Sequence, residues 1–94
     1  MFSVYILHSQ KTDRFYIGQT DNLSNRFDQH NSPENPNSTK KGQPWVLYLS
    51  IDCQSRLQAL RIERYIKKMK SRKYIETLKA FPEKVEAVKR AHDC

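Results

Sequence analysis

The sequence is poor in the features that would place it in a membrane, a disulfide scaffold or a zinc-binding fold. No hydrophobic run approaches the ~18 apolar residues of a membrane-spanning helix. The two cysteines, Cys53 and Cys94, form no CxxC pair, which argues against a zinc site and a disulfide framework. The opening MFSVYILHSQ lacks the basic start and small-residue cleavage site of a signal peptide. We therefore expect a reduced, cytoplasmic protein without membrane contact.

Positive charge is what the chain has in excess. It holds 17 Lys and Arg against 10 Asp and Glu, a net charge of +7. Such an excess suggests an acidic partner, either nucleic acid or an anionic membrane surface, although it can also serve solubility alone. With 94 residues the chain suits a single domain. The sequence does not define an oligomeric state, so a monomer is the default.

Hydrophobic periodicity predicts three strands and up to four helices. Segments rich in β-branched and aromatic residues are predicted strands at 2–8, 14–18 and 45–51. Helical spacing predicts helices at 22–30, 54–70 and 71–80, with a bend near Ser71, and a last helix beginning at Pro82. Thr20 or Asp21 is the expected cap of the first helix. The apolar stripe expected on the second helix consists of Ala59, Ile62, Ile66 and Met69.

This order, β-β-α-β-α-α plus a C-terminal helix, predicts an α+β fold with a small three-stranded antiparallel sheet flanked by helices. We expect the main domain to span 1–80 and a helical extension to span 81–94. If Leu7 pairs with Arg14 in the first hairpin, Tyr5 lies opposite Tyr16. Residues 31–44, rich in Pro, Asn and Ser, predict a long loop without regular structure, a kind of segment that is usually functional or disordered.

Six residues are candidates for chemistry, and each also has an ordinary explanation. The tyrosines can be strand aromatics, the glycine can end a strand, and the arginine can lie over its helix. The histidine can be a satisfied side chain, and the glutamate can pair with Lys67 at i,i+4. The candidates are Tyr5, Tyr16, Gly18, Arg26, His30 and Glu63. Taken singly, none of them requires a function.

As an ordered set, these residues resemble the GIY-YIG nuclease family. Tyr5 in SVYIL matches the tyrosine of the first motif, although Ser3 and Val4 stand where the family often has Gly and Ile. The second motif, YIG at 16–18, is intact. Arg26 and His30 follow it at the family's spacing, and ALRIERYIKKMKSRKYIETL is similar to the segment with the metal-binding glutamate. The resemblance covers roughly residues 2–80 and is greatest to short stand-alone members, which are related to the N-terminal catalytic domain of an excision-repair nuclease.

The resemblance implies a metal-dependent endonuclease that hydrolyses DNA phosphodiester bonds. It places Tyr5, Tyr16, Arg26, His30 and Glu63 in the catalytic site, with Glu63 as the ligand of Mg²⁺ or Mn²⁺. One carboxylate suffices, because Mg²⁺ keeps several waters and also uses substrate oxygens. An arginine suits the phosphate charge of the transition state. A tyrosine can accept a proton from water only if its pKa is depressed, and the sequence leaves open which tyrosine is the base.

Substrate contacts are expected around this set. Gly18 would let the protein backbone approach the substrate closely. Gln19 stands where some relatives have a lysine, and Lys40 or Lys41 in the long loop could compensate. A basic group follows Glu63 and either contacts the DNA backbone or is a solvated helix face: Lys67, Lys68, Lys70, Arg72 and Lys73. Lys73 is also the nearest match to a further polar residue of the family.

Two other classes of function stay open at this stage. The first is a non-catalytic nucleic-acid-binding module on the same scaffold, and the second is a protein-interaction domain with a basic surface. Because few residues lie outside the predicted core, we expect DNA structure rather than a long sequence to direct cleavage. Branched, flapped and damaged DNA all fit this expectation, and RNA stays open as a substrate.

Overall fold

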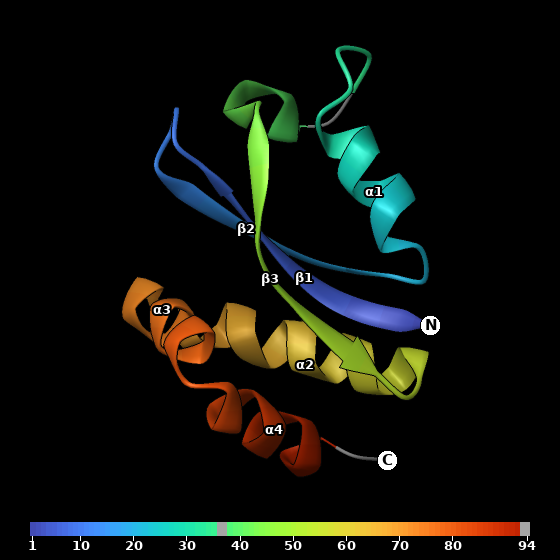
Figure 1. Ribbon diagram of the computed structural model, residues 1–94, viewed down its shortest axis with the longest axis vertical. Helices are drawn as coiled ribbons and strands as arrows, with labels where there is room; N and C mark the ends of the chain where they lie inside the picture. The colour runs from blue at the N-terminus through green and yellow to red at the C-terminus, as the bar shows by residue number, and fades with distance from the viewer. Residues whose placement is uncertain (36–37, 93–94) are drawn as a thin grey trace.

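A three-stranded antiparallel sheet with helices on both faces forms the protein, as a computed structural model shows for residues 1–35 and 38–92 (Figure 1). The strands are β1 (Phe2–Ser9), β2 (Arg14–Thr20) and β3 (Trp45–Cys53), in the order β2-β1-β3. The helices are α1 (Leu23–His30), η1 (a 3-10 helix, Ser38–Gly42), α2 (Arg56–Met69), α3 (Arg72–Ala80) and α4 (Pro82–Ala91). The predicted class and order are confirmed. Cys94 lies outside the described residues.

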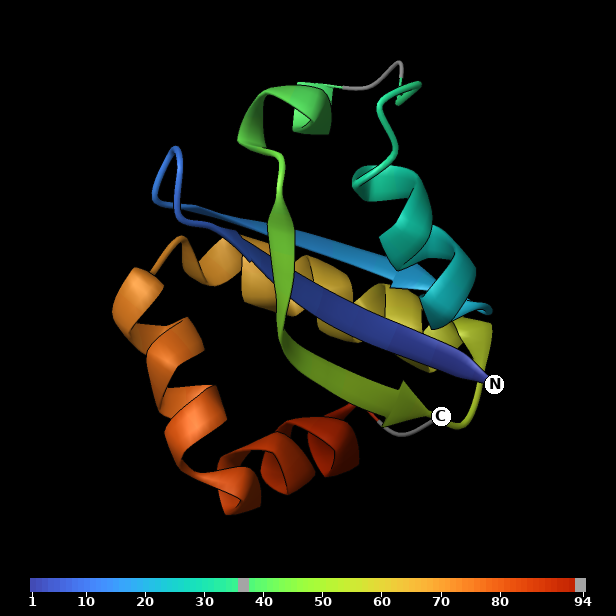
Figure 2. The same ribbon diagram turned by 45° about the horizontal axis from the view of Figure 1, so that its top comes forward.

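The two faces of the sheet pack against different layers (Figures 1 and 2). On one face, Val4 and Ile6 of β1 pack with α2, α3 and α4 in the larger core cluster. On the other face, Tyr5 and Leu7 pack with Trp45, while α1 covers them through Leu23 and Phe27. β1 is buried along most of its length because both of its faces are covered. The alternation in its sequence thus sends every second side chain to the layer that contains α1.

The register of the β1–β2 hairpin differs from the expected one by two residues. Leu7 pairs with Tyr16, not with Arg14, and Tyr5 therefore pairs with Gly18. The hairpin closes at the pair of Ser9 and Arg14, with a turn that contains a left-handed residue, Asp13 (φ 53°). Because side chains alternate with a period of two, this shift keeps every residue on its predicted face and changes its neighbour alone.

The start of α1 and the segment after it also differ from expectation. Asn22, and not Thr20 or Asp21, is the N-cap, since its side chain accepts a hydrogen bond from the Asn25 backbone amide (3.1 Å). In the segment expected to lack regular structure, the chain forms η1. Two amide side chains connect this segment to the sheet and to α1. Asn31 exchanges two hydrogen bonds with the Trp45 backbone, and Gln43 donates to the His30 carbonyl (2.7 Å).

The helix α2 lies across the sheet as the periodicity predicts. Ser55 caps its first turn, and three residues of the expected stripe are buried, namely Ala59, Ile62 and Ile66. Met69, the fourth, is 41 % exposed. It is the last residue of the helix, and the chain turns away immediately after it at Lys70, which has a left-handed backbone (φ 47°).

Contacts of three residues hold α3 and α4 against the sheet and α2. Arg72 at the start of α3 forms an ion pair with Asp13 of the hairpin and lies over the ring of Phe15. Val88 of α4 is buried in the larger core, so the segment expected to be an extension shares that core with α2. Gln58 of α2 also donates a hydrogen bond to a backbone carbonyl of α4 (3.1 Å). None of the described helices combines the length and hydrophobicity needed to cross a membrane.

The burial of the α2 stripe gives a direct test of this packing. Ile62 is fully buried, whereas Leu57 on the same helix is 48 % exposed. Ile62→Ala should lower the free energy of unfolding by about 2–5 kcal/mol, because it leaves a cavity in the core. Leu57→Ala is the control and should change it by less than ~1 kcal/mol. Urea denaturation followed by circular dichroism measures both, and equal losses would contradict the described orientation of α2.

Candidate active site

The ring of Tyr5 on β1 occupies the space that the neighbouring strand leaves open, because that strand has a glycine there. Its side chain is 1 % exposed, and its ring lies over Gly18 of β2. A Cβ atom at Gly18 would stand 2.5 Å from Tyr5 Cζ and closer still to the hydroxyl, so a larger residue cannot fit unless the ring moves. Gly18 is itself buried, and the Tyr5 ring occupies the space beside it; the close approach of its backbone to the substrate stays a prediction.

His30 connects the Tyr5 hydroxyl to the loop that follows α1. It is the last residue of α1 and is 3 % exposed. Its Nε2 lies 2.9 Å from Tyr5 Oη, and its Nδ1 lies 3.1 Å from Thr39 Oγ1. The Asn35 side-chain amide donates to the same Thr39 oxygen (2.7 Å) and to the His30 carbonyl (3.2 Å). Four polar side chains therefore form a continuous buried chain of hydrogen bonds from Asn35 to Tyr5.

The hydrogen bonds of His30 link two hydroxyl groups through one imidazole. Thr39 Oγ1 accepts from Asn35 and also lies against His30 Nδ1, while Tyr5 Oη lies against His30 Nε2. A neutral imidazole has one donor nitrogen and one acceptor nitrogen, so it donates to one of these hydroxyls and accepts from the other. The chain can therefore carry a proton between Tyr5 and the loop by a change of tautomer.

Burial and the charge of Arg26 shift the pKa values of both Tyr5 and His30. Burial raises the pKa of Tyr5 above its usual value, while the nearby Arg26 guanidinium acts in the opposite direction; the charges of Tyr16 and Glu63 raise it further. The pKa of His30 is lowered, first by burial and then by the positive charge of Arg26. Both effects favour the neutral form of His30, in which one ring nitrogen donates and the other accepts. One hydroxyl thus interacts with a cation of α1 and with a carboxylate of α2.

Tyr16 stands beside this pair on the same face of the sheet. Its ring centroid lies 4.8 Å from that of His30 and 6.3 Å from that of Tyr5. Unlike Tyr5, Tyr16 is half-buried, so part of its side chain reaches solvent. The two tyrosines are diagonal neighbours across the β1–β2 pair, although the predicted direct pairing is wrong.

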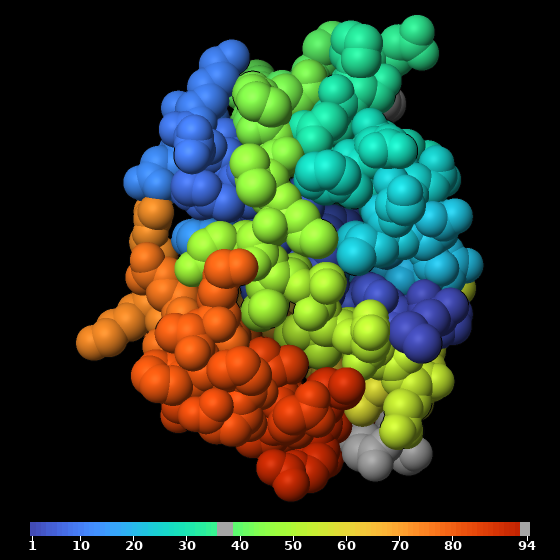
Figure 3. All heavy atoms as spheres, in the orientation of Figure 1, coloured from blue at the N-terminus to red at the C-terminus, as the bar shows by residue number. Residues whose placement is uncertain are grey.

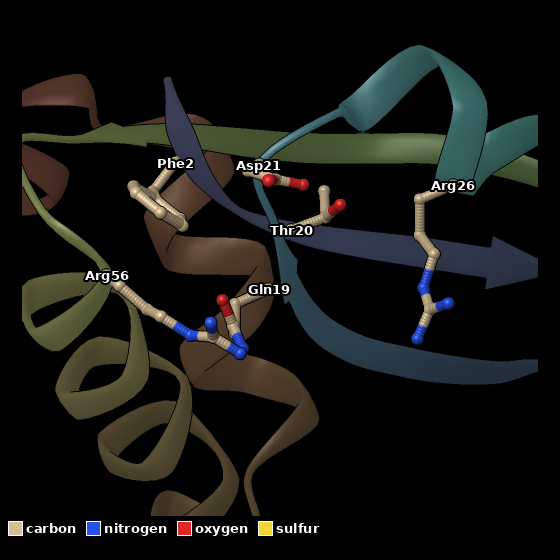
Figure 4. A pocket seen from close by; sticks show the side chains of 6 residues that line it. All are labelled: Phe2, Gln19, Thr20, Asp21, Arg26 and Arg56. Atoms are coloured by element: carbon tan, nitrogen blue, oxygen red, sulfur yellow. The ribbon is translucent and has the colours of Figure 1, made fainter.

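Arg26 projects from α1 into a pocket of about 240 Å³ beyond the end of β2 (Figure 4). Its guanidinium donates to the Gln29 side chain (3.2 Å), one turn further along the helix. Gln19 and Arg56 line the same pocket and point toward one another, as Figure 4 shows. Arg26 of α1 and Arg56 of α2 therefore line one hollow, a suitable place for an anionic ligand.

Glu63 lies in the middle of α2, in the helical layer on the opposite face of the sheet from α1. Its side chain is 15 % exposed and forms an ion pair with Lys67 (3.1 Å), so the ordinary i,i+4 explanation also holds. Among the described residues, no three His, Cys, Asp or Glu side chains cluster as a metal site would. A lone carboxylate still fits an ion such as Mg²⁺, which takes its other ligands from water and phosphate oxygens. Because its charge contributes to the raised pKa of Tyr5, Glu63 is the candidate ligand for such an ion.

The predicted substrate-binding lysines are divided among three places. Lys40 and Lys41 lie on η1, and Lys41 lines a pocket that also includes Tyr16. Lys67 is paired with Glu63. Lys70 and Lys73 are exposed near the junction of α2 and α3, and no described contact joins Lys73 to the tyrosines. From the same basic group, Arg72 is engaged with Asp13 and is a structural contact of the hairpin.

Sequence reasoning missed four residues that the structure brings to the site. Asn35 and Thr39 complete the buried hydrogen-bond chain, and Arg14 and Arg56 line the two neighbouring pockets. None of them has a spacing that singles it out, because loop residues and helix starts follow no periodicity. The abundance of Asn, Ser and Thr in the 31–44 loop was the one available signal, since such side chains often satisfy buried polar groups.

Comparison with known proteins identifies the class to which this fold and site belong. The sequence model of the GIY-YIG catalytic domain matches residues 1–76, which include both tyrosines, Arg26, His30 and Glu63. The chain therefore belongs to the GIY-YIG family, a nuclease-type family whose members generally depend on divalent metal ions and act on nucleic acid. Searches of curated proteins and of solved structures give no significant match.

The contact between Gly18 and Tyr5 predicts a coupling that can be measured. Gly18→Ala should lower the free energy of unfolding by about 1–3 kcal/mol, because the new methyl group overlaps the Tyr5 ring. In a Tyr5→Leu background the same change should cost less, since leucine lacks the atoms that clash. A double-mutant cycle from urea denaturation checks this, and additive losses would contradict the packing of the ring on the glycine.

The lowered pKa of His30 predicts a loss of stability on acidification. Below the unfolded value of ~6.5, the unfolded chain binds more protons than the folded one, so stability falls as the pH decreases toward the folded pKa. The slope should not exceed ~1.4 kcal/mol per pH unit. Asp13, whose pKa Arg72 lowers, loses its contribution only below its usual value of 3.8. His30→Gln should therefore flatten the profile between pH ~5 and ~7, and an unchanged profile would be inconsistent with this origin.

Proposed function

We propose that the protein is a divalent-metal-dependent endonuclease that hydrolyses DNA phosphodiester bonds and is directed by DNA structure. The observation that supports this proposal best is the presence of three polar side chains around one hydroxyl. Tyr5 Oη lies 2.9 Å from His30 Nε2, interacts with Arg26, and has its pKa raised in part by the charge of Glu63. A base, a phosphate-binding cation and a metal-binding carboxylate are the groups that such hydrolysis needs.

In this proposal Tyr5 is the general base: it would pass its hydroxyl proton to the unprotonated Nε2 of His30, 2.9 Å away, and accept in its place a proton from the attacking water. The Nε2–H so formed would then donate to the Tyr5 oxygen, and the Arg26 guanidinium lies close by. Both would stabilise a phenolate, since hydrogen bonds to the charged form favour it. Burial opposes this and keeps the proton on Tyr5 while the site is empty of substrate. The half-exposed Tyr16 would orient the water or a phosphate oxygen.

Arg26 would hold the phosphate that is cut. Its planar guanidinium offers donors in a fixed arrangement that matches phosphate oxygens. The pocket that it shares with Gln19 and Arg56 has room for an oxygen-rich ligand and is lined mainly by polar and charged side chains. Gln19 would replace the lysine of some relatives with a neutral donor, and Arg56 would restore the positive charge from the opposite side.

Glu63 would hold the metal ion, with water and phosphate as its other ligands. A divalent ion bound there would polarise the scissile phosphate and stabilise the leaving oxygen. Lys67 neutralises this carboxylate and would have to release it, which its 52 % exposure allows. Because the Glu63 side chain is 15 % exposed, the bound ion would have to replace the positive charge that Lys67 withdraws.

The alternative function is a nucleic-acid-binding module without catalysis. The pairing of Glu63 with Lys67 favours it, because in that state the carboxylate needs no metal. The two functions differ in one respect that can be measured, since a binding module gains affinity when an acidic residue beside the phosphates is removed and has no cleavage to lose.

The Glu63→Gln variant separates these functions. If Glu63 holds the metal, Mg²⁺-dependent nicking of supercoiled plasmid should collapse, because an amide is a poor ligand for a hard cation. DNA affinity, measured in Ca²⁺, should stay equal or rise. If Glu63 merely pairs with Lys67, folding should weaken by no more than ~0.5 kcal/mol and nicking should survive.

Two further variants control this experiment. Glu83→Gln makes the same charge change on the exposed surface of α4 and should leave nicking unchanged. Arg26→Ala should lower nicking about 10²–10³-fold, the usual cost of removing one donor to a transition-state charge. Circular dichroism checks that each variant is folded. Full nicking by folded Glu63→Gln would exclude Glu63 as the metal ligand.

A further inference from the structure

A second pocket, of about 500 Å³, lies between the tip of the β1–β2 hairpin and η1. In Figure 3 the hairpin (blue) and the segment of η1 and β3 (green) lie next to each other at the top of the molecule. Tyr16 lines this pocket, so it borders the candidate active site without being part of the Arg26 pocket. We call it the hairpin pocket.

The hairpin pocket combines aromatic rings with positive charge. Arg14 and Tyr16 are alternate residues of β2 and therefore face the same side of the sheet. Lys41 of η1 lines the pocket as well, and Trp45 lies at the start of β3. Arg14 and Lys41 are exposed, Tyr16 is half-buried and Trp45 is 6 % exposed. Aromatic faces beside cations are the usual means of binding unpaired nucleic acid.

The aromatic side of the pocket is built rigidly. Trp45 donates its indole N–H to the Thr39 carbonyl (2.7 Å), and its ring lies against Gly42. A Cβ atom at Gly42 would stand 2.8 Å from Trp45 Cε2, so this glycine permits η1 to settle on the indole. Tyr16 contacts Trp45 with a centroid distance of 6.3 Å. A ring that is already fixed loses little conformational entropy when it binds a base.

The distance from the hairpin pocket to Tyr5 suits a nucleotide close to the cut. Arg14 precedes Gly18, which lies under the Tyr5 hydroxyl, by four residues along β2. At ~3.3 Å per residue this separation is ~13 Å, the length of about four stacked nucleotides of one strand. An unstacked strand is longer per nucleotide, so fewer would span it.

We infer that the hairpin pocket binds an unpaired nucleotide of the DNA strand next to the cleavage position. The base would stack on the half-buried Tyr16, which Trp45 supports from behind, and Arg14 and Lys41 would hold the phosphates. A paired base remains stacked in the duplex and cannot enter such a pocket. The inference rests on the proposed nuclease function, and it specifies the substrate class as DNA with a single-stranded flap or branch beside the cut.

Binding of two matched DNA probes tests this inference without any cleavage. One probe is a blunt duplex, and the other is the same duplex with a short flap that has 2-aminopurine at its first unpaired position. In Ca²⁺ the protein should bind the flapped probe about 10-fold more tightly, within the range of one base stacked on an aromatic ring. The 2-aminopurine fluorescence should be quenched. Equal affinity for both probes, or no quenching, would overturn the inference.

Matched variants identify the pocket as the cause. Arg14→Gln with Lys41→Gln should abolish most of the preference for the flap. Lys84→Gln with Arg90→Gln removes the same charge from the exposed surface of α4 and should retain the preference. Tyr16→Phe should retain the quenching and Tyr16→Leu should lose it, because stacking needs the ring and not the hydroxyl. If both double variants lower the affinity for the blunt and the flapped probe by the same factor, the hairpin pocket has no specific role in binding the flap.

The same proteins distinguish failure of the inference from failure of the proposed function. Preferential, quenched binding of the flap by a protein that nicks no DNA would support the pocket and reject the nuclease. Nicking of plasmid by a protein that binds both probes equally would support the nuclease and reject the pocket.

Discussion

The packing of the Tyr5 ring on Gly18 is the contact on which the whole site depends. It carries a hydroxyl from the central strand to the edge strand, where the hydroxyl lies within hydrogen-bond distance of His30 and close to Arg26, both of α1. A side chain on β2 at this position would move the Tyr5 ring and its hydroxyl away from these partners. The charge of Glu63 on α2 also contributes to the raised pKa of Tyr5.

The loop after α1 supports this arrangement from the far side of the imidazole. Thr39 and Asn35 satisfy His30, while Asn31 and Gln43 tie the ends of the loop to β3 and to α1. A histidine with both nitrogens bonded cannot rotate freely, so its Nε2 stays directed at Tyr5. The 31–44 loop thus determines the orientation of the His30 side chain through hydrogen bonds and not through hydrophobic packing.

The sequence predicted the α+β class, the strand order along the chain and the faces of β1, because each follows from periodicity. It did not predict the hairpin register, since Leu7 opposite Arg14 and Leu7 opposite Tyr16 bury the same residues. It identified Tyr5, Arg26, His30 and Glu63 through their resemblance to a family, and the family match covers those residues. Thr39 and Arg14 escaped prediction because their importance comes from which residues lie next to them in space, which no local pattern encodes.

The 31–44 loop also divides the site along the polypeptide. Both tyrosines, Arg26 and His30 precede it, whereas Thr39 is within it and Glu63 follows it. The first half of the chain provides β1, β2 and α1, and the second half provides β3 and the layer that covers their other face. Neither half can assemble the constellation alone. A chain cleaved within this loop would be a split protein, whose two fragments regain the site only by reassociating.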